Sequence, residues 1–438
     1  MTDPASTTEP APEDIEVVSV GCGSSHSVAL LSCDAVVSWG RGEDGQLGHG
    51  DADERLSAEA VHALQNAGAT AVVCGAEYSV AICGKNNEVY SWGWGDFGRL
   101  GHGDCNDIFI PQPIAALSGL SVVRVACGDT HTLAVTDTGD LYSFGRNQNG
   151  QLGLGNTQDS LGPQLVQALK GDPATSIACG AEHTLVATAS GEVYSWGWGR
   201  YGNLGDGERQ DRWLPTRVTA LSGHNIVTVC CGWRHSVALD NGGAIYTFGW
   251  SKYGQLGHGN FSDEALPKRV ESLRDRQIRI VAGGWRHTVA ADHNGQLHSW
   301  GWNKFGQLGI QSTVDAATPV MVADLASEDV VQLACGWRHT IAVTRAGQVY
   351  SWGRGVNGQL GHGDMRDLSA PKRVENLCKG SINPAKLTQT GQAASAYIPP
   401  SDRYAIVPDR HRNALNGGMA VPDILVQQAE AKRQRTAV

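Results

Sequence analysis

A segment of about 52 residues recurs seven times along this chain of 438 residues, and this repeat restricts the possible folds more than any other feature. Its first marker is Gly-x-x-His, with Tyr once in the His place, and its copies end at His26, Tyr78, His131, His183, His235, His287 and His339. A second marker, Trp or Phe before Gly, keeps the same spacing at Trp39, Trp92, Phe144, Trp196, Phe248, Trp300 and Trp352. The two columns agree over seven copies and predict units that each contact their neighbours.

Each repeat carries the pattern of several short strands. In the third copy, β-branched and apolar runs over Ser121–Ala126, His131–Thr136 and Asp140–Phe144 are separated by turn residues. A Gly-rich segment follows, and then a Pro-led apolar stretch such as Leu266–Val270. Three or four strands per unit, repeated seven times, predict an all-β fold: a seven-bladed β-propeller over residues 15–380.

The two ends of the chain differ from the repeats. Residues 1–14 form an acidic arm that we expect to be disordered, and Ile15–Val20 is expected to pair with the last blade and close the ring. Residues 381–438 are rich in Ser, Ala, Gly, Gln and Pro, carry a net charge of +3, and predict a flexible tail with a short helix near Ile424–Arg433.

Composition excludes some functions. The net charge is −10, which argues against nucleic-acid binding by bulk electrostatics and allows at most weak chromatin association. No apolar run approaches the roughly 20 residues that span a bilayer, so no membrane partner is expected. Six of the eleven cysteines occupy one repeat position and are interpreted as small buried apolar residues. Unpaired thiols favour a reducing compartment, the cytosol or the nucleus.

Residues present in every copy are interpreted as scaffold. The recurring His residues are poor candidates for catalysis or metal binding, and the Gly-rich loops lack the Lys and the following helix of a phosphate-binding loop. No nucleophile, acid–base pair or metal-ligand cluster stands apart from the repeats. The sequence therefore predicts a binding protein without catalytic residues, metal or cofactor.

Two variable columns carry the candidate site. The two residues inside Gly-x-x-His become Trp-Arg in three successive copies, at Trp233-Arg234, Trp285-Arg286 and Trp337-Arg338. Two residues after the Trp/Phe marker, the second column reads Arg41, Trp94, Arg146, Trp198, Trp250, Trp302 and Arg354. Strand direction places both columns on one face, and Trp and Arg are enriched at the centres of interfaces. The alternative is that the three Trp-Arg pairs only stabilise the propeller by cation–π stacking.

Charges near these columns are sorted along the chain. Early copies carry mostly acids and late copies mostly bases, with Arg41, Arg99 and Arg146 as exceptions. A face with one acidic and one basic half is self-complementary about a two-fold axis, which predicts a homodimer. The alternative is a solvated face of mixed charge.

The segment Trp352–Gly361 carries a signature that resembles the regulator-of-chromosome-condensation repeat family. The three copies of Gly-Trp-Arg-His followed by Thr or Ser are similar to those of the plant ultraviolet-B photoreceptors within that family, although Ser236 and Gly283 depart from the pattern. The resemblance implies a receptor whose own tryptophans absorb light and whose dimer dissociates on absorption.

The same resemblance implies residue roles. Trp285 and Trp233 would be the main sensing pair, Trp337 would assist, and Trp94 of the opposite subunit would approach them. Arg234 would support the cluster, and Trp198, Trp250 and Trp302 would collect energy or pack. The pairs that would bridge the dimer are Arg286 with Asp96 and Asp107, Arg146 with Glu182, Arg338 with Asp44, and Glu43 with Lys304.

The tail supplies a candidate partner site. Val407-Pro408 resembles the motif with which this family binds the WD-repeat domain of a ubiquitin ligase after light, and Val421-Pro422 is a weaker second candidate. WD-repeat proteins that promote re-dimerisation are further expected partners, in cytoplasm and nucleus. A nucleotide-exchange factor for a nuclear GTPase and a chromatin-associated scaffold are the alternative functions.

Overall fold

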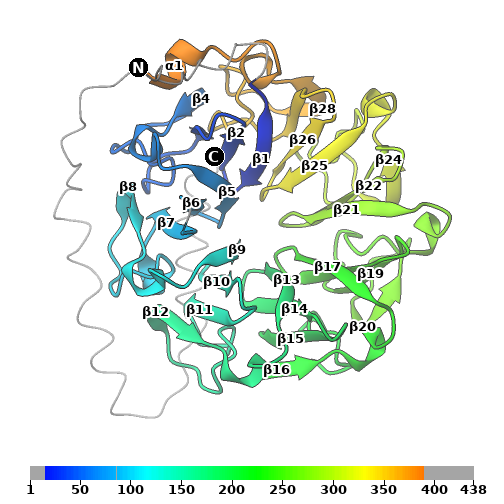
Figure 1. The fold of residues 1–438 in the computed structure, drawn as a ribbon. Helices are drawn as coiled ribbons and strands as arrows, with labels where there is room; N and C mark the ends of the chain where they lie inside the picture. Colours follow the sequence, from blue (N-terminus) through cyan, green and yellow to red (C-terminus); the bar gives the residue numbers. More distant parts are fainter. Residues whose placement is uncertain (1–14, 85, 389–438) are drawn as a thin grey trace, which may run out of the picture. The chain divides into compact units, whose positions relative to one another are not determined.

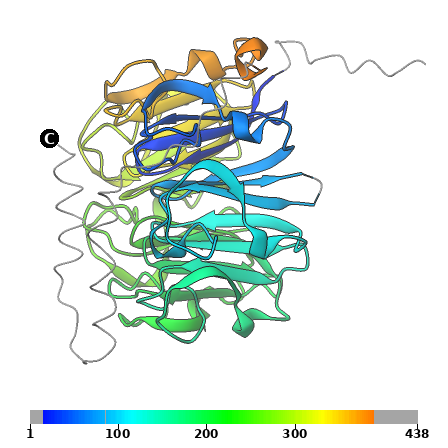
Figure 2. The same cartoon turned by 90° about the vertical axis from the view of Figure 1, so that its left-hand side faces the viewer.

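A computed structural model describes residues 15–84 and 86–388, which form the predicted seven-bladed β-propeller (Figure 1). Each blade is an antiparallel sheet of four strands that are consecutive in sequence. Figure 2 shows the same sheets from the rim of the ring. In the third blade, the three predicted strands agree with the observed ones within one residue at each end.

The strands of blades 1 to 4 are β1 Val17–Cys22, β2 His26–Leu31, β3 Val36–Gly40, β4 Arg55–Ala60, β5 Ala69–Cys74, β6 Tyr78–Cys83, β7 Glu88–Gly93, β8 Ile108–Pro113, β9 Val122–Cys127, β10 His131–Thr136, β11 Leu141–Gly145, β12 Ser160–Leu165, β13 Ala174–Cys179, β14 His183–Thr188, β15 Val193–Gly197 and β16 Arg212–Arg217. Those of blades 5 to 7 are β17 Ile226–Cys231, β18 His235–Asp240, β19 Ile245–Gly249, β20 Glu264–Arg269, β21 Ile278–Gly283, β22 His287–Asp292, β23 Leu297–Gly301, β24 Ala316–Met321, β25 Val330–Cys335, β26 His339–Thr344, β27 Val349–Gly353 and β28 Leu368–Arg373.

Short helices occupy the connections. In the described chain, seven 3-10 helices follow the fourth strands: η2 His62–Leu64, η4 Ala115–Leu117, η5 Gln167–Leu169, η6 Thr219–Leu221, η7 Glu271–Leu273, η8 Ala323–Leu325 and η9 Glu375–Leu377. One more, η3 Asp96–Gly98, lies in the loop between the third and fourth strands of blade 2. The helix α1 spans Pro384–Thr388. No helix of the described chain is long and apolar enough to cross a bilayer.

The recurring histidines join neighbouring blades. His287 Nε2 lies 3.1 Å from the Thr340 hydroxyl of the next blade, and five other histidines of the column make the same contact to Ser or Thr. In blade 2, the Tyr78 hydroxyl replaces the imidazole, 2.8 Å from Thr132. Burial lowers the pKa of each of these histidines to about 3, so they are neutral. The structural interpretation of this column is confirmed.

One backbone carbonyl per blade makes a second link to the next blade. The carbonyl of Gln255 accepts the Trp300 indole N–H at 2.9 Å and the Thr288 hydroxyl at 2.8 Å. This carbonyl belongs to a column seven residues after the Trp/Phe marker: Gln46, Arg99, Gln151, Asn203, Gln255, Gln307 and Gln359. Where the next blade carries Phe144 or Phe248, only the hydroxyl donates. The aromatic marker is therefore a hydrogen-bond donor at five of the seven junctions.

Ring closure differs from the prediction. β1 pairs with β2 inside blade 1, and no strand of the described chain is shared between blade 1 and blade 7. The first strand of every copy belongs to its own blade, so the N-terminal strand completes blade 1. The junction instead rests on a core in which Ile15 and Val17 pack with Ile341 and Val374, and on the Trp39 indole N–H, which donates to Gln359 O at 2.8 Å.

Residues just after 380 pack against the propeller. Ile382 is buried in the same core, and Leu387 of α1 packs against it. The Lys379 amino group lies 3.2 Å from the Glu16 carboxylate. Both ends of the described chain thus reinforce the junction between blades 1 and 7.

Replacing Trp39 with Phe should lower the free energy of unfolding by about 1 kcal/mol, the usual net contribution of one hydrogen bond. The change removes the indole donor, while the Ser27 hydroxyl still donates to Gln359 O at 3.0 Å. Phe occupies the same column at Phe144 and Phe248, so the ring fits. Equilibrium urea unfolding measures the effect, and an unchanged midpoint would contradict this account of the junction.

Candidate functional site

The two variable columns meet on one face of the ring, which we call the loop face. It consists of the turns between the first and second strands of each blade and the loops between the third and fourth. Because successive strands are antiparallel, both connections lie at the same end of each sheet. The convergence that strand direction predicted is confirmed by ring contacts between the columns, from Trp233 to Trp250 and from Trp285 to Trp302, with centroids 5.5 Å apart in both pairs.

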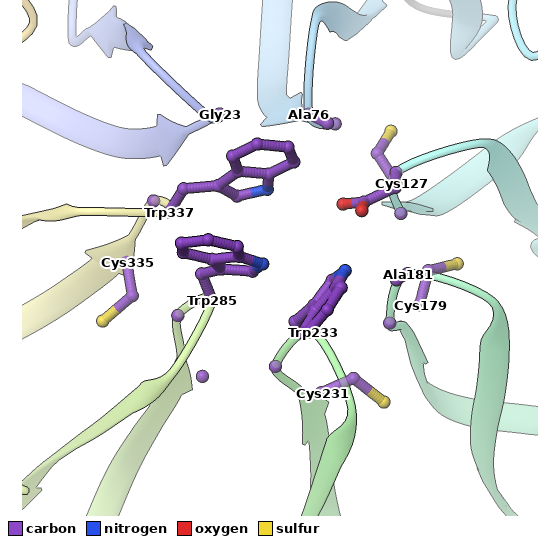
Figure 3. Close-up of a pocket in the computed structure, with 18 of the residues that line it drawn as sticks. Gly23, Ala76, Cys127, Cys179, Ala181, Cys231, Trp233, Trp285, Cys335 and Trp337 are labelled. Carbon is purple, nitrogen blue, oxygen red and sulfur yellow. The ribbon is translucent and has the colours of Figure 1, made fainter. Parts of the chain in front are cut away.

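Three tryptophans from successive blades lie at the centre of this face (Figure 3). Trp285 stacks on Trp337 with ring centroids 5.3 Å apart and an interplanar angle of 15°. Trp233 meets Trp285 edge to face at 5.5 Å and 62°. Trp285 therefore contacts both other central tryptophans as well as Trp302 of the second column.

The aromatic network extends beyond the residues that the sequence singled out. Trp198 reaches Trp250 through Tyr201, with ring centroids at 5.2 and 5.8 Å. Tyr253 lies between Trp250 and Trp302, and Phe305 contacts Trp302. These additional rings stand five residues after the Trp/Phe marker, a column that is aromatic in blades 2, 4, 5 and 6 and would have identified them.

The Arg286 guanidinium lies inside this network. Its central carbon is 3.6 Å from the Trp285 ring centroid and within 5.4 Å of those of Trp233, Trp250, Trp302 and Tyr253. Its Nη1 donates to the Tyr253 hydroxyl at 3.1 Å. Arg234 stacks in the same way on Trp233 at 3.8 Å and on Trp198 at 4.5 Å. Each such contact is worth about 0.5–2 kcal/mol, so the cations and the rings hold one another in place.

Positive charge accumulates in blades 6 and 7. Burial, and then the neighbouring cations Arg354 and Arg286, lower the pKa of Arg338 to about 10 against the opposing effect of Glu77. A guanidinium whose pKa falls is destabilised in its charged form. This half of the loop face therefore favours the approach of an anionic group.

Negative charge accumulates in blades 1 and 2. Burial, and then the nearby carboxylates of Glu77, Glu43 and Asp107, raise the pKa of Asp44 to about 7 against the opposing effect of Arg41. Glu77 is only 6% exposed; it lies 3.4 Å from Arg41 Nη1 and accepts Gln46 Nε2–H at 3.0 Å. Arg41 thus lies near several carboxylates, and this half of the face favours the approach of a further cation.

The remaining predicted interface residues also lie on the loop face. Asp96 is exposed, Asp107 Oδ1 accepts the Gly95 N–H at 2.9 Å, and the Lys304 ammonium lies 5.7 Å from the Phe305 ring. Arg146 pairs with Glu182 at 3.2 Å within the chain. Because the structure holds one copy, the bridges between two subunits stay predictions.

Trp94 lies in blade 2, outside the central group of three. Its ring is 3.9 Å from the Arg99 guanidinium. Its predicted approach to the cluster of an opposite subunit is likewise a prediction. Val407, Pro408, Val421 and Pro422, and the short helix expected near 424–433, lie outside the described residues.

A cavity of about 190 Å³ opens beside the three tryptophans, bordered by the Gly turns and the cysteine column. The six cysteines are only partly buried, because they border this cavity as well as the blades. In Figure 3, Cys127, Cys179, Cys231 and Cys335 direct their sulfur atoms away from the indoles. Burial raises the pKa of Cys74 to about 12, which keeps its thiol protonated. Within residues 15–84 and 86–388, no group of His, Cys, Asp or Glu has the arrangement of a metal site.

The chain matches the family model of the RCC1-like domain over residues 2–235 and 220–396. It belongs to the RCC1-like domain family. Among relatives, the Arabidopsis thaliana ultraviolet-B receptor UVR8 is 50% identical over 428 residues, which cover 96% of each chain. Human HERC2, an E3 ubiquitin-protein ligase, is 38% identical over 307 residues, 69% of this chain but 6% of HERC2.

Solved structures of RCC1-like propellers agree with the fold. Human WBSCR16 superposes with a TM-score of 0.67 at 25% identity, covering 76% of this chain and 88% of that one. Prp20p from Saccharomyces cerevisiae gives a TM-score of 0.69 at 22% identity, covering 84% and 90%. The second likeness establishes the RCC1-like fold and carries no functional argument.

Proposed function

We propose that this protein is an ultraviolet-B photoreceptor that uses its own tryptophans as the chromophore. The observation that carries the proposal is the Arg286 guanidinium surrounded by four indoles and a tyrosine on a charged face. The near full-length relationship to a plant ultraviolet-B receptor at 50% identity supports it. Trp285 and Trp233 form the sensing pair, Trp337 assists, and Trp198, Trp250 and Trp302 transfer excitation to them or pack.

In darkness two copies associate through their loop faces. In the single copy, burial and then the surrounding acids raise the pKa of Asp44, whereas burial and then the surrounding cations lower the pKa of Arg338. A two-fold axis brings each half against its opposite and relieves both imbalances. The pairs are Arg286 with Asp96 and Asp107, Arg338 with Asp44, and Lys304 with Glu43, and Trp94 of one copy approaches the tryptophans of the other. Arg146 and Glu182, which pair at 3.2 Å within one copy, exchange partners across the interface.

Light weakens this association through the arginines. An excited indole changes its charge distribution next to Arg286, whose guanidinium touches the ring at 3.6 Å. Losing one partner of a buried ion pair costs about 3–5 kcal/mol, so a few disturbed pairs are enough to separate two copies held mainly by charge. No cofactor and no catalytic step are needed.

The separated protein signals by binding. Its Val407-Pro408 segment engages the WD-repeat domain of a ubiquitin ligase, and further WD-repeat proteins promote re-association. The chain acts in cytoplasm and nucleus, where its eleven cysteines stay as thiols. A nucleotide-exchange factor or a chromatin scaffold shares the propeller, but nothing on the loop face favours either over the receptor.

Trp285→Phe should abolish dissociation by ultraviolet-B light while leaving the dark dimer intact, because Phe absorbs at shorter wavelengths and keeps an aromatic ring. Size-exclusion chromatography of dark and irradiated samples measures this. Trp352→Phe, which changes a buried indole in the blade core, is the matched control and should respond like the unchanged protein. Light-driven dissociation of Trp285→Phe would refute the sensor assignment.

The dark dimer should weaken as the pH falls below about 7. In the single copy, burial and then Glu77 raise the pKa of Asp44 to about 7, whereas Arg338 of a second copy would lower it on association. Association then releases protons, so the affinity is full above the raised pKa and is lost as Asp44 protonates. Sedimentation equilibrium at pH 8, 7 and 6 measures the dissociation constant.

Asp44→Asn is the control for that titration and should associate weakly with a flatter dependence on pH. An affinity that stays constant or rises from pH 8 to pH 6 in the unchanged protein would contradict the role given to Asp44.

A further inference from the structure

Blade 2 departs from the other blades at one buried position. The column whose backbone carbonyl links neighbouring blades is Gln in five blades and Asn in one, but Arg99 in blade 2, and its side chain is 0% exposed. In the five Gln blades, the side-chain oxygen accepts the N–H of the residue two positions earlier at 2.9–3.0 Å, for example the Tyr253 N–H at Gln255. A guanidinium has no acceptor and cannot make this bond.

The loop conformation changes with the side chain. Phe97, two positions before Arg99, has a φ of +64°, whereas none of the six equivalent residues has a positive φ. The Asp96 carbonyl turns toward the guanidinium and accepts Arg99 Nε–H at 2.9 Å. In place of the bond to a Gln side chain, the Phe97 N–H interacts with the Cys105 thiol. Burial raises the pKa of this thiol, and the backbone N–H groups of Phe97 and Gly98 oppose that rise. In the described chain, only this loop between third and fourth strands forms a 3-10 helix, η3.

Arg99 also ties this loop to its surroundings. Its Nη1 donates to the Asp129 carbonyl in blade 3 at 2.9 Å, and its guanidinium lies 3.9 Å from the Trp94 ring. The reoriented Phe97 ring lies 5.1 Å from the Arg146 guanidinium of blade 3. Arg99 thus fixes the surroundings of Trp94, Asp96 and Arg146, three residues with predicted roles in the interface.

We propose that Arg99 is a positioning residue: by replacing the recurring Gln it flips the peptide between Asp96 and Phe97 and sets the acidic half of the loop face for the second copy. The local part of this proposal rests on the geometry of the single chain. The consequence for association rests on the proposed function.

Arg99→Gln tests the local part, because Gln is the residue with which five other blades fold. A crystal structure of this variant should show Phe97 with a negative φ and its N–H bonded to the new side chain. Amide hydrogen exchange over residues 94–98 should change by about tenfold or more, while the equivalent segment 250–254 keeps its rate. Phe97 remaining near +64° with unchanged exchange would overturn the proposal.

Arg99→Lys covers the case in which Arg99→Gln fails to fold. Lys retains the charge but has no acceptor, so Phe97 should keep a positive φ, and a negative φ in this variant would also overturn the proposal. For association, the dark dissociation constant of Arg99→Gln should rise by about tenfold or more over the unchanged protein. Arg274→Gln removes the same charge from an exposed arginine and should leave it unchanged.

The two proposals fail in distinguishable ways. If the unchanged protein does not associate in darkness, the receptor proposal fails while the conformation of Phe97 still decides the role of Arg99. If the unchanged protein associates and Arg99→Gln associates equally well, Arg99 does not position the interface.

Discussion

One backbone carbonyl per blade carries the connection on which the propeller depends. It accepts a hydroxyl of the next blade at every junction and an indole N–H at five of the seven. The neutral histidines contact the same hydroxyls, so each of these hydroxyls joins a histidine and a carbonyl of the preceding blade. Because the ring closes without a shared strand, blade 1 is held against blade 7 by side-chain packing, by these bonds and by contacts such as the Lys379–Glu16 ion pair.

A scaffold held in this way leaves the loop face free to vary. The residues inside Gly-x-x-His and those after the Trp/Phe marker lie outside the hydroxyl, carbonyl and histidine links that recur at each junction, and their own contacts between blades differ from one junction to the next. Three blades use them to place Trp beside Arg, and two others use them to collect carboxylates around Arg41. In each half, neighbouring like charges add to the effect of burial, which raises the pKa of Asp44 and lowers that of Arg338. In the proposed receptor, this face combines the light-absorbing cluster with the charges that a second copy neutralises.

The fold was predictable from the periodicity of the sequence, and the shared face of the central tryptophans was predictable from the strand directions that the repeat implies. The ring closure was not, since alternation of residues cannot tell whether Val17–Cys22 pairs with its own blade or with the last one. Tyr253 was missed because it lies in a third column, and its contact with Arg286 depends on the path of the loop. The sequence shows that Arg99 replaces the recurring Gln. The flip at Phe97 that accompanies this exchange could be identified only from the backbone angle and the hydrogen bonds of the structure.

Exchange of charge across the proposed interface tests the central claim most directly. Arg338→Asp alone should repel Asp44 of a second copy, and Asp44→Arg alone should repel Arg338, so each variant should be monomeric in darkness. An equimolar mixture should form a heterodimer, because both opposing pairs are then restored, and analytical ultracentrifugation would show the doubled mass. If the mixture stays monomeric, or if either variant alone remains a dimer, two copies do not meet through these opposed halves.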